Sequence, residues 1–396
     1  MSAPVRLLTF SSLYPNAAQP NHGVFVENRL RHLLGSGGAE STVLAPVPWF
    51  PFTGARFGAW AAFARAPRAE TRHGIAVHHP RFLVLPRVGM NLAPWLLYRA
   101  ALPAARRLLA AGVTFDAIDA HYVYPDGVAA VWLGRALGRP VVVTARGTDV
   151  NLIPRYAVPR RLIQRAIAGA AALVAVSGAL RDALLELGAP PEKVTVLRNG
   201  VDTTLFRPPA DRAAARAALG LAGPTLISVG HLIERKGHHL AVEALAGLPG
   251  WSLLVVGEGP ERARLEALAA RADLAGRVRL LGARPHAELP GLYGAADALV
   301  LASSREGWAN VLLESMACGT PVVASDIWGN PEVVRAPEAG RIVRRDAAAI
   351  AAGVTDLMAA APDRAATRAY AEGFGWGPTT EGQLALFRRL VAGRSG

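Results

Sequence analysis

Short, continuously apolar runs recur along the chain at intervals long enough to hold a helix. Residues 141–144, 253–256 and 299–301 are rich in Val and Leu and show no alternation with polar residues. Such runs are typical of strands that helices cover on both faces. Ala- and Arg-rich stretches of helical length separate them, and this alternation predicts an α/β protein with parallel sheets.

The apolar runs form two series. Candidate strands of the first series are residues 6–10, 41–47, 75–80, 117–121, 140–145, 172–177 and 194–198. Those of the second series are residues 225–230, 252–257, 278–282, 298–303, 321–325 and 340–343. The interval 49–72 mixes Gly, Pro and aromatic residues, which predicts a loop with short helices.

The chain length predicts two domains. A chain of 396 residues exceeds the size at which a single hydrophobic core usually stops growing. The joint falls within residues 199–209, which precede an Ala- and Arg-rich helix at 212–219. We therefore predict two Rossmann-like, doubly wound α/β domains, residues 1–206 and 207–377, facing each other across a cleft. Ligands of such sheets bind beyond the carboxyl ends of the strands, so functional motifs are expected directly after strands.

The number of cysteines and the length of the apolar segments indicate the cellular compartment of the protein. Cys318 is the single cysteine, which excludes an intrachain disulfide and a thiolate-rich metal site and favours the reducing cytoplasm. The N-terminus runs into a strand without the features of a secretory signal. The most apolar window, residues 166–180, is shorter than the ~20 residues of a spanning helix, so no transmembrane helix is expected.

The formal net charge of +13 is concentrated in the N-terminal half, where residues 1–206 contain 22 basic and 11 acidic side chains. The 43 basic residues include only two lysines, Lys193 and Lys236. Such an excess of Arg is more typical of coding bias than of a nucleic-acid site, so no nucleic-acid partner is expected.

The basic surplus is sharpest in residues 50–110, where nine Arg are opposed by Glu70 alone. The interleaved aromatic residues are Trp49, Phe50, Phe52, Phe57, Trp60, Phe63, Trp95 and Tyr98. Basic and aromatic side chains together suit the headgroup level of an anionic bilayer. The alternative is a solvated Arg face over ordinary core aromatics. A cytoplasmic protein with this segment as a candidate contact to the inner face of the membrane is expected.

The most specific segment is residues 303–323, S-S-R-E-G-W-A-N-V-L-L-E-S-M-A-C-G-T-P-V-V. An apolar strand ends, a polar loop follows, and an amphipathic helix starts near Asn310. The free N–H groups of its first turn make an anion site that fits a diphosphate. Two carboxylates would repel a phosphate, so Glu306 is assigned to sugar hydroxyls and Glu314 to ribose hydroxyls. The alternative is that Glu306 caps the helix and Glu314 is a solvated side chain.

A second motif is S-V-G-H-L-I-E-R-K-G at residues 228–237, again a strand followed by Gly and a cluster of cations. The compact ammonium of Lys236 suits a phosphate oxygen. Arg235 is a second candidate for this work, and His231 is the least certain of the three. The alternative is a surface loop with scattered charge.

Three further candidates lie after strands or before a helix of the N-terminal half. In D-A-H-Y-V-Y-P-D-G, His121 is a candidate contact to the donor sugar, although a lone His is more often structural. In T-A-R-G-T-D-V-N, Asp149, with Arg146 nearby, is a candidate to orient an acceptor or a neighbouring side chain. Gly23 lies in a loop that opens a helix, where the backbone can approach the donor phosphates; a simple turn glycine would look identical.

Together these motifs resemble the retaining glycosyltransferases of family 4, which have the GT-B fold. The resemblance covers nearly the whole chain in order: the early glycine loop, D-A-H, R-G-T-D, N-G-V-D-T-T-L-F, V-G-H-L-I-E-R-K-G, V-V-G-E-G-P, A-A-D and R-E-G-W-A-N-V-L-L-E. The joint occurrence of these motifs is far more specific than any one of them.

The resemblance implies a role for each matching position. Lys236 contacts the donor diphosphate, Glu306 the donor sugar and Glu314 the ribose, while His121 lies beside the transferred sugar. The donor-binding candidates are Gly23, Gly230, His231, Arg235, Glu258, Gly307, Trp308, Asn310, Val311 and Glu314, with His121, Lys236 and Glu306 as the catalytic set. The family commonly has Arg where this chain has His231, so Arg235 is the candidate to compensate. The implied fold also returns the last helix, residues 378–396, to the N-terminal domain.

The implied reaction is transfer from a nucleotide sugar to a glycan or lipid-linked acceptor, as in polysaccharide or glycolipid assembly. Retention follows from the resemblance, and front-face attack assisted by the leaving phosphate is the preferred hypothesis. No D-x-D pair is present to hold a divalent metal, and no cofactor is expected. The alternatives are a sugar-nucleotide epimerase, a phosphorylase and a non-catalytic sugar-nucleotide-binding module. An oxidoreductase would need G-x-G-x-x-G, but Arg262 occupies the third place after Gly257 and Gly259.

Overall fold

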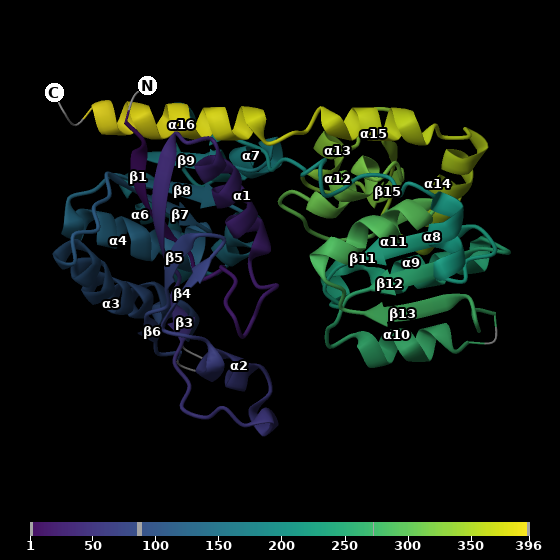
Figure 1. Ribbon diagram of the computed structural model, residues 1–396, viewed down its shortest axis with the longest axis horizontal. Helices are drawn as coiled ribbons and strands as arrows, with labels where there is room; N and C mark the ends of the chain where they lie inside the picture. The colour runs from purple at the N-terminus through teal and green to yellow at the C-terminus, as the bar shows by residue number, and fades with distance from the viewer. Residues whose placement is uncertain (1–2, 85–88, 272, 394–396) are drawn as a thin grey trace. The chain divides into compact units, whose positions relative to one another are not determined.

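The computed structural model describes residues 3–84, 89–271 and 273–393, and the chain divides into two compact units (Figure 1). The N-terminal unit contains the chain up to Arg198 together with the segment from Gly377 onward. The C-terminal unit is Asn199–Trp376. The boundary predicted after Phe206 falls a few residues inside the C-terminal unit.

The N-terminal unit is built on an eight-stranded sheet with the order β10-β9-β8-β7-β1-β2-β5-β4. The strands are β1 (Val5–Phe10), β2 (Ala39–Leu44), β4 (Ala69–Arg72), β5 (Ile75–His78), β7 (Ala117–His121), β8 (Val141–Ala145), β9 (Ala172–Ala175) and β10 (Val194–Val196). Neighbouring strands are parallel except β4, which pairs antiparallel with β5 at one edge. A separate parallel pair is formed by β3 (Val47–Pro48) and β6 (Arg81–Phe82).

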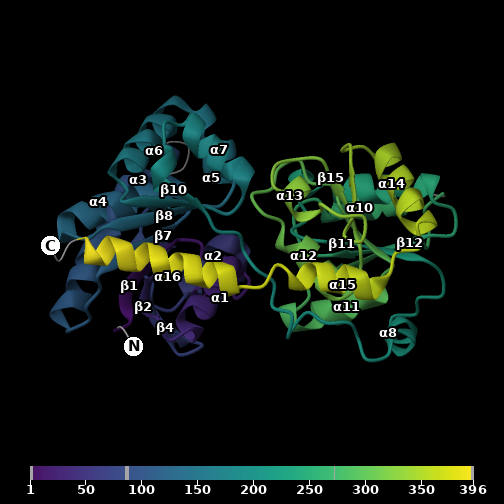
Figure 2. The ribbon, with the colours of Figure 1, turned by 90° about the horizontal axis from the view of Figure 1, so that it is seen from above.

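Helices cover both faces of this sheet (Figure 2). On one face α16 (Gly377–Ala392) packs against α1 (Val24–Gly35) and β1, and its Leu384 and Phe387 join the core formed with Val5 and Val142. On the other face α4 (Val128–Leu137) lies between α3 (Gly89–Ala110) and α6 (Ala157–Gly169). The shorter helical segments are η1 (Ala55–Phe57), α2 (Ala59–Arg65), η2 (Val123–Gly127), α5 (Thr148–Asn151), η3 (Ile153–Arg155), α7 (Gly178–Glu186) and η4 (Pro191–Lys193).

The C-terminal unit contains a six-stranded parallel sheet with the order β13-β12-β11-β14-β15-β16. Its strands are β11 (Thr225–Val229), β12 (Ser252–Val256), β13 (Val278–Gly282), β14 (Ala298–Leu301), β15 (Val322–Ser325) and β16 (Gly340–Val343). Numbered within the unit, this is the 3-2-1-4-5-6 order of a doubly wound sheet.

Two helix layers enclose the C-terminal sheet. One layer contains α9 (His238–Ala244), α10 (Arg262–Ala269) and α14 (Ala347–Ala359), whose apolar side chains share a core with the strands. The second contains α8 (Arg212–Ala218), α11 (Leu289–Ala295), α12 (Asn310–Ala317) and α15 (Arg364–Glu372). The remaining segments are η5 (Glu234–Lys236), η6 (Leu245–Gly247), η7 (His286–Glu288) and α13 (Asn330–Val333).

The parallel six-stranded sheet and the mainly parallel eight-stranded sheet confirm the predicted α/β class, and two local predictions are wrong. The candidate strand 41–47 ends at Leu44, and Val47 belongs to the separate pair β3–β6. The interval 49–72 contains η1 and α2 as short helices but also the edge strand β4. The sequence Ala-Glu-Thr-Arg of β4 has charged residues that suit an edge but no apolar run, so periodicity did not reveal a strand.

Candidate functional site

The switch point of the C-terminal sheet lies between β11 and β14. β11 pairs with β12 on one side and with β14 on the other, and the order of strands reverses there. The loops that follow β11 and β14 therefore start side by side, where doubly wound sheets bind ligands. The backbone N–H of Ser304 donates to the carbonyl of Arg235 at 2.8 Å, which joins the two loops directly.

Lys236 and Glu306 form an ion pair at this point. Lys236 Nζ lies 2.6 Å from Glu306 Oε1, and Ser303 Oγ donates to the same oxygen at 2.7 Å. Arg235 Nη1 lies 3.9 Å from Glu306 Oε2 and donates to the carbonyl of Arg305 at 2.7 Å. The second motif and the S-S-R-E-G segment thus form one cluster, in which two cations flank one carboxylate.

The surroundings keep Glu306 ionised. Burial alone would raise the pKa of its carboxyl, but the charges of Lys236 and Arg235 and the hydrogen bonds from Lys236 and Ser303 outweigh burial and hold the pKa below its ordinary value. The Glu306 side chain is 9% exposed and that of Lys236 is 17% exposed. An ammonium has three N–H donors, so Lys236 can donate to a ligand oxygen while it stays paired.

Gly237 makes the close approach of the two loops possible. It has φ of +71° and lies between η5 and α9. A Cβ at this position would lie 2.0 Å from the carbonyl oxygen of Ala302, directly after β14. Gly230 opens the same loop, and a Cβ there would lie 3.7 Å from Lys236 Cδ and from His238 Nε2.

His238 belongs to this cluster although the motif analysis did not single it out. Its Nδ1 lies 2.9 Å from Ser228 Oγ at the end of β11. Burial, and next the positive charge of Lys236, lower its pKa to about 4. The available signal was its position two residues after Lys236, which does not distinguish a buried residue from an exposed one.

The segment before α12 is hydrogen-bonded to Asn199, the first residue of the C-terminal unit. The N-cap residue of α12 is Ala309, with no side-chain cap, so Glu306 does not cap the helix. Trp308 Nε1 donates to the carbonyl of Asn199 at 3.0 Å, and Asn310 Oδ1 accepts from Asn199 Nδ2 at 3.2 Å. Gly307 is buried and Val311 is half-buried. The uncapped first turn of α12 therefore offers N–H groups to an anion.

Glu314, one turn into α12, is held from two sides. Tyr293 donates its hydroxyl to Glu314 Oε2 at 3.0 Å, and His286 Nε2 lies 3.5 Å from Glu314 Oε1. The hydrogen bond to Glu314 raises the pKa of His286 despite the opposing effect of burial. The Glu314 side chain is only 14% exposed, so it is not a freely solvated side chain. No sequence signal had connected Tyr293 or His286 with this carboxylate.

Glu258 and His231 lie at the outside of the β11 and β12 loops. Glu258 is exposed and pairs with Arg262 at 2.8 Å. The backbone N–H of Leu232 donates to the carbonyl of Glu258 at 2.9 Å, so these loops are joined through the main chain. His231 is exposed. Within the described part of the chain, neither side chain is hydrogen-bonded or ion-paired to Lys236 or Glu306.

In the N-terminal unit, His121 and Arg146 meet at the carboxyl edge of the sheet. His121 Nε2 lies 3.3 Å from Asp119 Oδ2, and Arg146 Nη2 lies 2.8 Å from His121 Nδ1. Burial is the largest influence on the pKa of His121 and lowers it, so the imidazole is neutral at pH 7. Asp149 accepts from the backbone N–H groups of Val123 and Gly147, each at 2.7 Å, and so fixes this loop rather than pointing at open space.

Gly23 lies near the same edge and is the N-cap residue of α1. Its φ is +70°, and a Cβ would lie 2.3 Å from the carbonyl carbon and oxygen of Leu13. Phe25, two residues later, lies under the guanidinium of Arg146, whose Cζ is 5.3 Å from the ring centroid. The structure therefore brings together the elements that carry Gly23, His121, Arg146 and Asp149 within the N-terminal unit.

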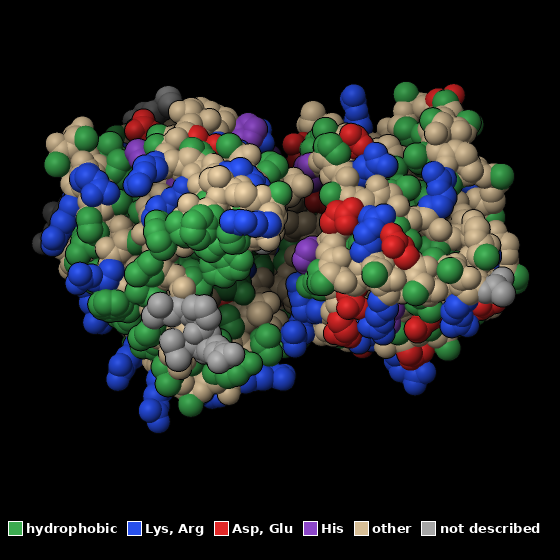
Figure 3. Space-filling model, turned by 90° about the horizontal axis from the view of Figure 1, so that it is seen from below, with side chains coloured by type: hydrophobic (Ala, Val, Ile, Leu, Met, Phe, Trp, Pro, Cys, Tyr) green, Lys and Arg blue, Asp and Glu red, His purple; other side chains and the backbone are tan. Residues whose placement is uncertain are grey.

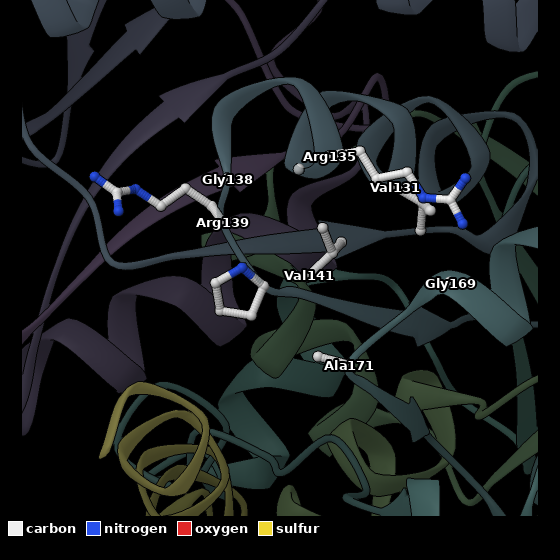
Figure 4. A pocket seen from close by; sticks show the side chains of 9 residues that line it. Val131, Arg135, Gly138, Arg139, Val141, Gly169 and Ala171 are labelled. Carbon is white, nitrogen blue, oxygen red and sulfur yellow. The ribbon is translucent and has the colours of Figure 1, made fainter. Parts of the chain in front are cut away.

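A pocket of about 310 Å³ lies elsewhere in this unit (Figure 4). Its lining includes Val131, Gly138, Val141 and Ala171, so it lies at the amino ends of β8 and β9. This is the edge opposite to the one that carries His121. Figure 4 shows the side chains of Arg135 and Arg139 directed away from each other, so they do not converge on an anion. The pocket is therefore not part of the candidate site.

Two features of the described part of the chain bear on the expected partners. No helix in this part is both long and apolar enough to cross a membrane. No group of three or more His, Cys, Asp or Glu side chains in the same part is arranged to hold a metal ion.

Two family models match the chain, one over each half of the sequence. Residues 34–205 match the model described as Glycosyltransferase Family 4, and residues 211–374 match the model described as Glycosyl transferases group 1. A D-inositol 3-phosphate glycosyltransferase 1 from Catenulispora acidiphila is 30% identical, with 100% of this chain and 98% of that protein covered. A D-inositol 3-phosphate glycosyltransferase from Segniliparus rotundus is 36% identical over 52% of this chain and 49% of its own length.

Solved structures share the whole fold at low sequence identity. Sucrose-phosphate synthase from Thermosynechococcus elongatus has a TM-score of 0.79 and 22% identity, covering 98% of this chain and 100% of that one. HepE from Anabaena, in complex with UDP and glucose, has a TM-score of 0.73 and 22% identity with the same coverage. These likenesses extend over both units and concern the fold.

Proposed function

The chain belongs to the family 4 glycosyltransferases with the GT-B fold, and from that membership we propose that it transfers a sugar from a nucleoside diphosphate donor with retention of anomeric configuration. The observation that carries the proposal is the Lys236–Glu306 pair at the switch point of the C-terminal sheet. It places a partly exposed ammonium beside a carboxylate where ligands of this sheet type bind.

The Lys236–Glu306 pair reduces the repulsion between a bound diphosphate and the nearby carboxylate. Two anions close to each other repel, but Lys236 neutralises Glu306, and Arg235 adds a further positive charge. Glu306 can then accept hydrogen bonds from sugar hydroxyls while Lys236 donates to the diphosphate. The uncapped first turn of α12 supplies additional N–H donors to the same anion.

In the proposed reaction the bond between the anomeric carbon and the phosphate oxygen breaks, and negative charge develops on the departing diphosphate. The acceptor oxygen bonds to the anomeric carbon from the same face and gives its proton to the leaving phosphate oxygen. Lys236, Arg235 and α12 stabilise the departing charge, and loss of one preorganised donor of this kind costs roughly 2.7–4 kcal/mol of barrier. These groups let the transfer proceed without a divalent metal.

The remaining assignments are part of the same proposal. Glu314 accepts from ribose hydroxyls, with Tyr293 holding one of its oxygens. In the N-terminal unit, His121 is neutral and positioned by Asp119 and Arg146, and we assign it to a hydroxyl of the transferred sugar. The acceptor is a glycan or a lipid-linked saccharide, and the reaction takes place in the cytoplasm.

The test begins with nucleotides, because a ligand that binds the folded state raises thermal stability by mass action. UDP, GDP and ADP are added separately to the protein, and UDP is tried first because HepE is named with UDP. One nucleotide is expected to raise Tm, and Lys236→Ala is expected to abolish this rise relative to the variant's own ligand-free Tm. Lys193→Ala is the matched control, because the only other lysine donates to the carbonyls of Ala168 and Ala170 in the N-terminal unit.

The sugar form of the stabilising nucleotide is then supplied with candidate acceptors, and the product is assigned by NMR. A product that keeps the anomeric configuration of the donor is expected. Inversion would remove the retaining mechanism. Interconversion of donors in the absence of any acceptor would identify an epimerase, and a Tm that no nucleotide raises would overturn the proposal.

A further inference from the structure

The exposed apolar side chains of this protein are concentrated in one segment. Among the described residues, ten large apolar side chains are exposed, and eight of them lie between residues 49 and 95. Six of these, from 39% to 53% exposed, are Trp49, Phe52, Trp60, Leu83, Leu92 and Trp95. Single exposed apolar residues are ordinary, whereas a group of them marks an interaction surface.

Ring contacts and main-chain pairing hold the first part of this group together. The ring of Phe50 lies 5.8 Å from that of Phe52 and 5.6 Å from that of Trp60. Trp49 N donates to the carbonyl of Phe82 at 2.7 Å, next to the β3–β6 pair, so Trp49 lies near Leu83. Packing between aromatic rings and backbone pairing therefore hold these exposed side chains in place.

The start of α3 extends the group. Leu92 and Trp95 are three residues apart in α3 and share its exposed side, and Arg99, one turn further, lies with its Cζ 5.4 Å from the Trp95 ring centroid. α3 packs against β6. β6 pairs with β3, and Trp49 directly follows β3 in the chain. Figure 3 shows hydrophobic side chains gathered on one face of the N-terminal unit, with Lys and Arg side chains at the rim.

Positively charged side chains without an ion-pair partner among the described residues border these apolar side chains. Arg56 lies with its Cζ 4.8 Å from the Phe57 ring centroid, and Arg65 donates to the carbonyl of Thr53 at 3.1 Å. Glu70 is the single acidic residue of the segment 50–110, and it is bound to the buried His79 at 2.9 Å. Not every Arg of the segment contributes, because Arg72 is paired with Glu27 and Arg87 lies outside the described residues.

We propose that this face, formed by Trp49, Phe52, Trp60, Leu83, Leu92 and Trp95 with Arg56, Arg65 and Arg99, docks on the surface of an anionic lipid bilayer. Indole and phenyl groups insert at the headgroup level, and guanidinium groups at the same level meet lipid phosphates. The proposal does not depend on the donor chemistry proposed above, since docking requires neither donor nor acceptor.

Charge argues for a lipid partner over a second copy of the chain. A symmetric dimer through this face would bring Arg56, Arg65 and Arg99 of both copies into one interface, where like charges repel each other. A bilayer that contains anionic lipid supplies the opposite charge over the whole face. The bilayer is therefore the partner that matches both properties of the surface.

The test is flotation of the full-length protein with vesicles of phosphatidylcholine alone and of phosphatidylcholine with phosphatidylglycerol. Binding is expected to the second vesicles and to weaken as salt rises. Each arginine near an anionic surface contributes about fivefold to partitioning, so Arg56→Gln/Arg65→Gln is expected to bind about 25-fold more weakly. Arg264→Gln/Arg344→Gln, which neutralises two exposed arginines of the C-terminal unit, is the matched control and is expected to bind as the wild type does.

The apolar contribution is tested by Leu92→Ser/Trp95→Ser, which is expected to weaken binding by about tenfold or more. If this variant has a lowered Tm, a second experiment measures quenching of the wild-type tryptophan fluorescence by vesicles that contain brominated phosphatidylglycerol. Quenching is expected because Trp49, Trp60 and Trp95 are exposed. Lack of binding to phosphatidylglycerol vesicles at low salt would overturn the proposal. It would also fail if the arginine variant bound like its control, or if light scattering showed a wild-type dimer that Leu92→Ser/Trp95→Ser dissociates.

Discussion

The ammonium of Lys236 lies 2.6 Å from Glu306 Oε1, although 70 residues separate the two in the chain. The pair joins the loop after β11 to the loop after β14. The two partners differ in burial, since the carboxylate is nearly enclosed while the ammonium keeps some contact with solvent. Removing one partner therefore has a different consequence from removing the other.

We expect Lys236→Met to destabilise the protein more than Glu306→Gln. The first change leaves a buried carboxylate without its closest cation, which costs about 3–5 kcal/mol. The second leaves an ammonium that solvent can reach and an amide that Ser303 can still bond, so a cost of about 1 kcal/mol is expected. Urea unfolding at pH 7.5 measures both, and the double variant is expected to lose less than the sum of the single losses. Equal losses for the two single variants would contradict the expectation.

Tyr293→Phe is expected to weaken ribose recognition without a change of shape. Tyr293 is buried, and its hydroxyl is the group that holds Glu314 Oε2. Without that hydrogen bond Glu314 is less well oriented, and discrimination between a ribonucleotide and its 2′- and 3′-deoxy forms is expected to fall about fivefold to tenfold. Calorimetric titration with the nucleotide that stabilises the wild type measures this ratio.

The matched control for Tyr293→Phe is Tyr370→Phe in the same unit. The hydroxyl of Tyr370 donates to the carbonyl of Val333 at 2.8 Å and accepts from the backbone N–H of Arg335, so it is engaged away from Glu314. Its removal is expected to lower Tm and to leave the ratio between ribose and deoxyribose ligands unchanged. A ratio that changes equally in both variants would mean that Tyr293 acts through general stability and does not position Glu314.

His238 is expected to make the protein less stable at mildly acidic pH. The folded-state pKa is lowered from 6.5 to about 4, chiefly by burial and then by the charge of Lys236. Between these values the unfolded state binds more protons, so the contribution of neutral His238 is present above pH 6.5 and is lost as the pH falls toward 4. In urea unfolding, the stability advantage of the wild type over His238→Asn is expected to shrink by about 2 kcal/mol from pH 7.5 to pH 5. An advantage that stays constant with pH would refute this.

The strands and the site loops could be predicted from the sequence because each has a strong local signal. Buried parallel strands are continuous apolar runs, and β7, β13 and β16 have the predicted bounds. The site motifs follow strands, so their positions could be inferred from the general behaviour of doubly wound sheets. The edge strand β4 has no apolar run, which is why periodicity missed it, although it pairs locally with β5 across the two-residue turn His73-Gly74.

The contacts among site residues could not be predicted from the sequence in the same way. Lys236 and Glu306 belong to two motifs, and only the adjacency of β11 and β14 brings them together. Tyr293 lies in α11 and meets Glu314 because α11 packs against α12, and nothing in the local sequence of either helix encodes that contact. Asp149 was a candidate to orient an acceptor or a neighbouring side chain, and the structure shows its carboxylate engaged with backbone N–H groups of its own loop and of Val123.

Gly237→Ala is expected to disrupt the site through the main chain. Gly237 has φ of +71°, and a Cβ would lie 2.0 Å from the carbonyl oxygen of Ala302. Relief requires the loop after β11 to move away from the end of β14, which separates Lys236 from Glu306. The backbone strain costs about 1–2 kcal/mol and the clash adds roughly 1–3 kcal/mol, so a loss of at least about 2 kcal/mol in urea unfolding is expected, together with weaker nucleotide binding.

Gly250→Ala separates the two contributions, because Gly250 has φ of +78° but a Cβ there would meet nothing within 4 Å. This variant carries the same kind of backbone strain without the clash, so its loss is expected to stay at about 1–2 kcal/mol. Gly250 lies before β12, away from the Lys236 loop, so nucleotide affinity is expected to remain that of the wild type. If Gly237→Ala bound nucleotide as tightly as Gly250→Ala, the prediction would be refuted. The close approach of the two loops would then not be what positions Lys236 for nucleotide binding.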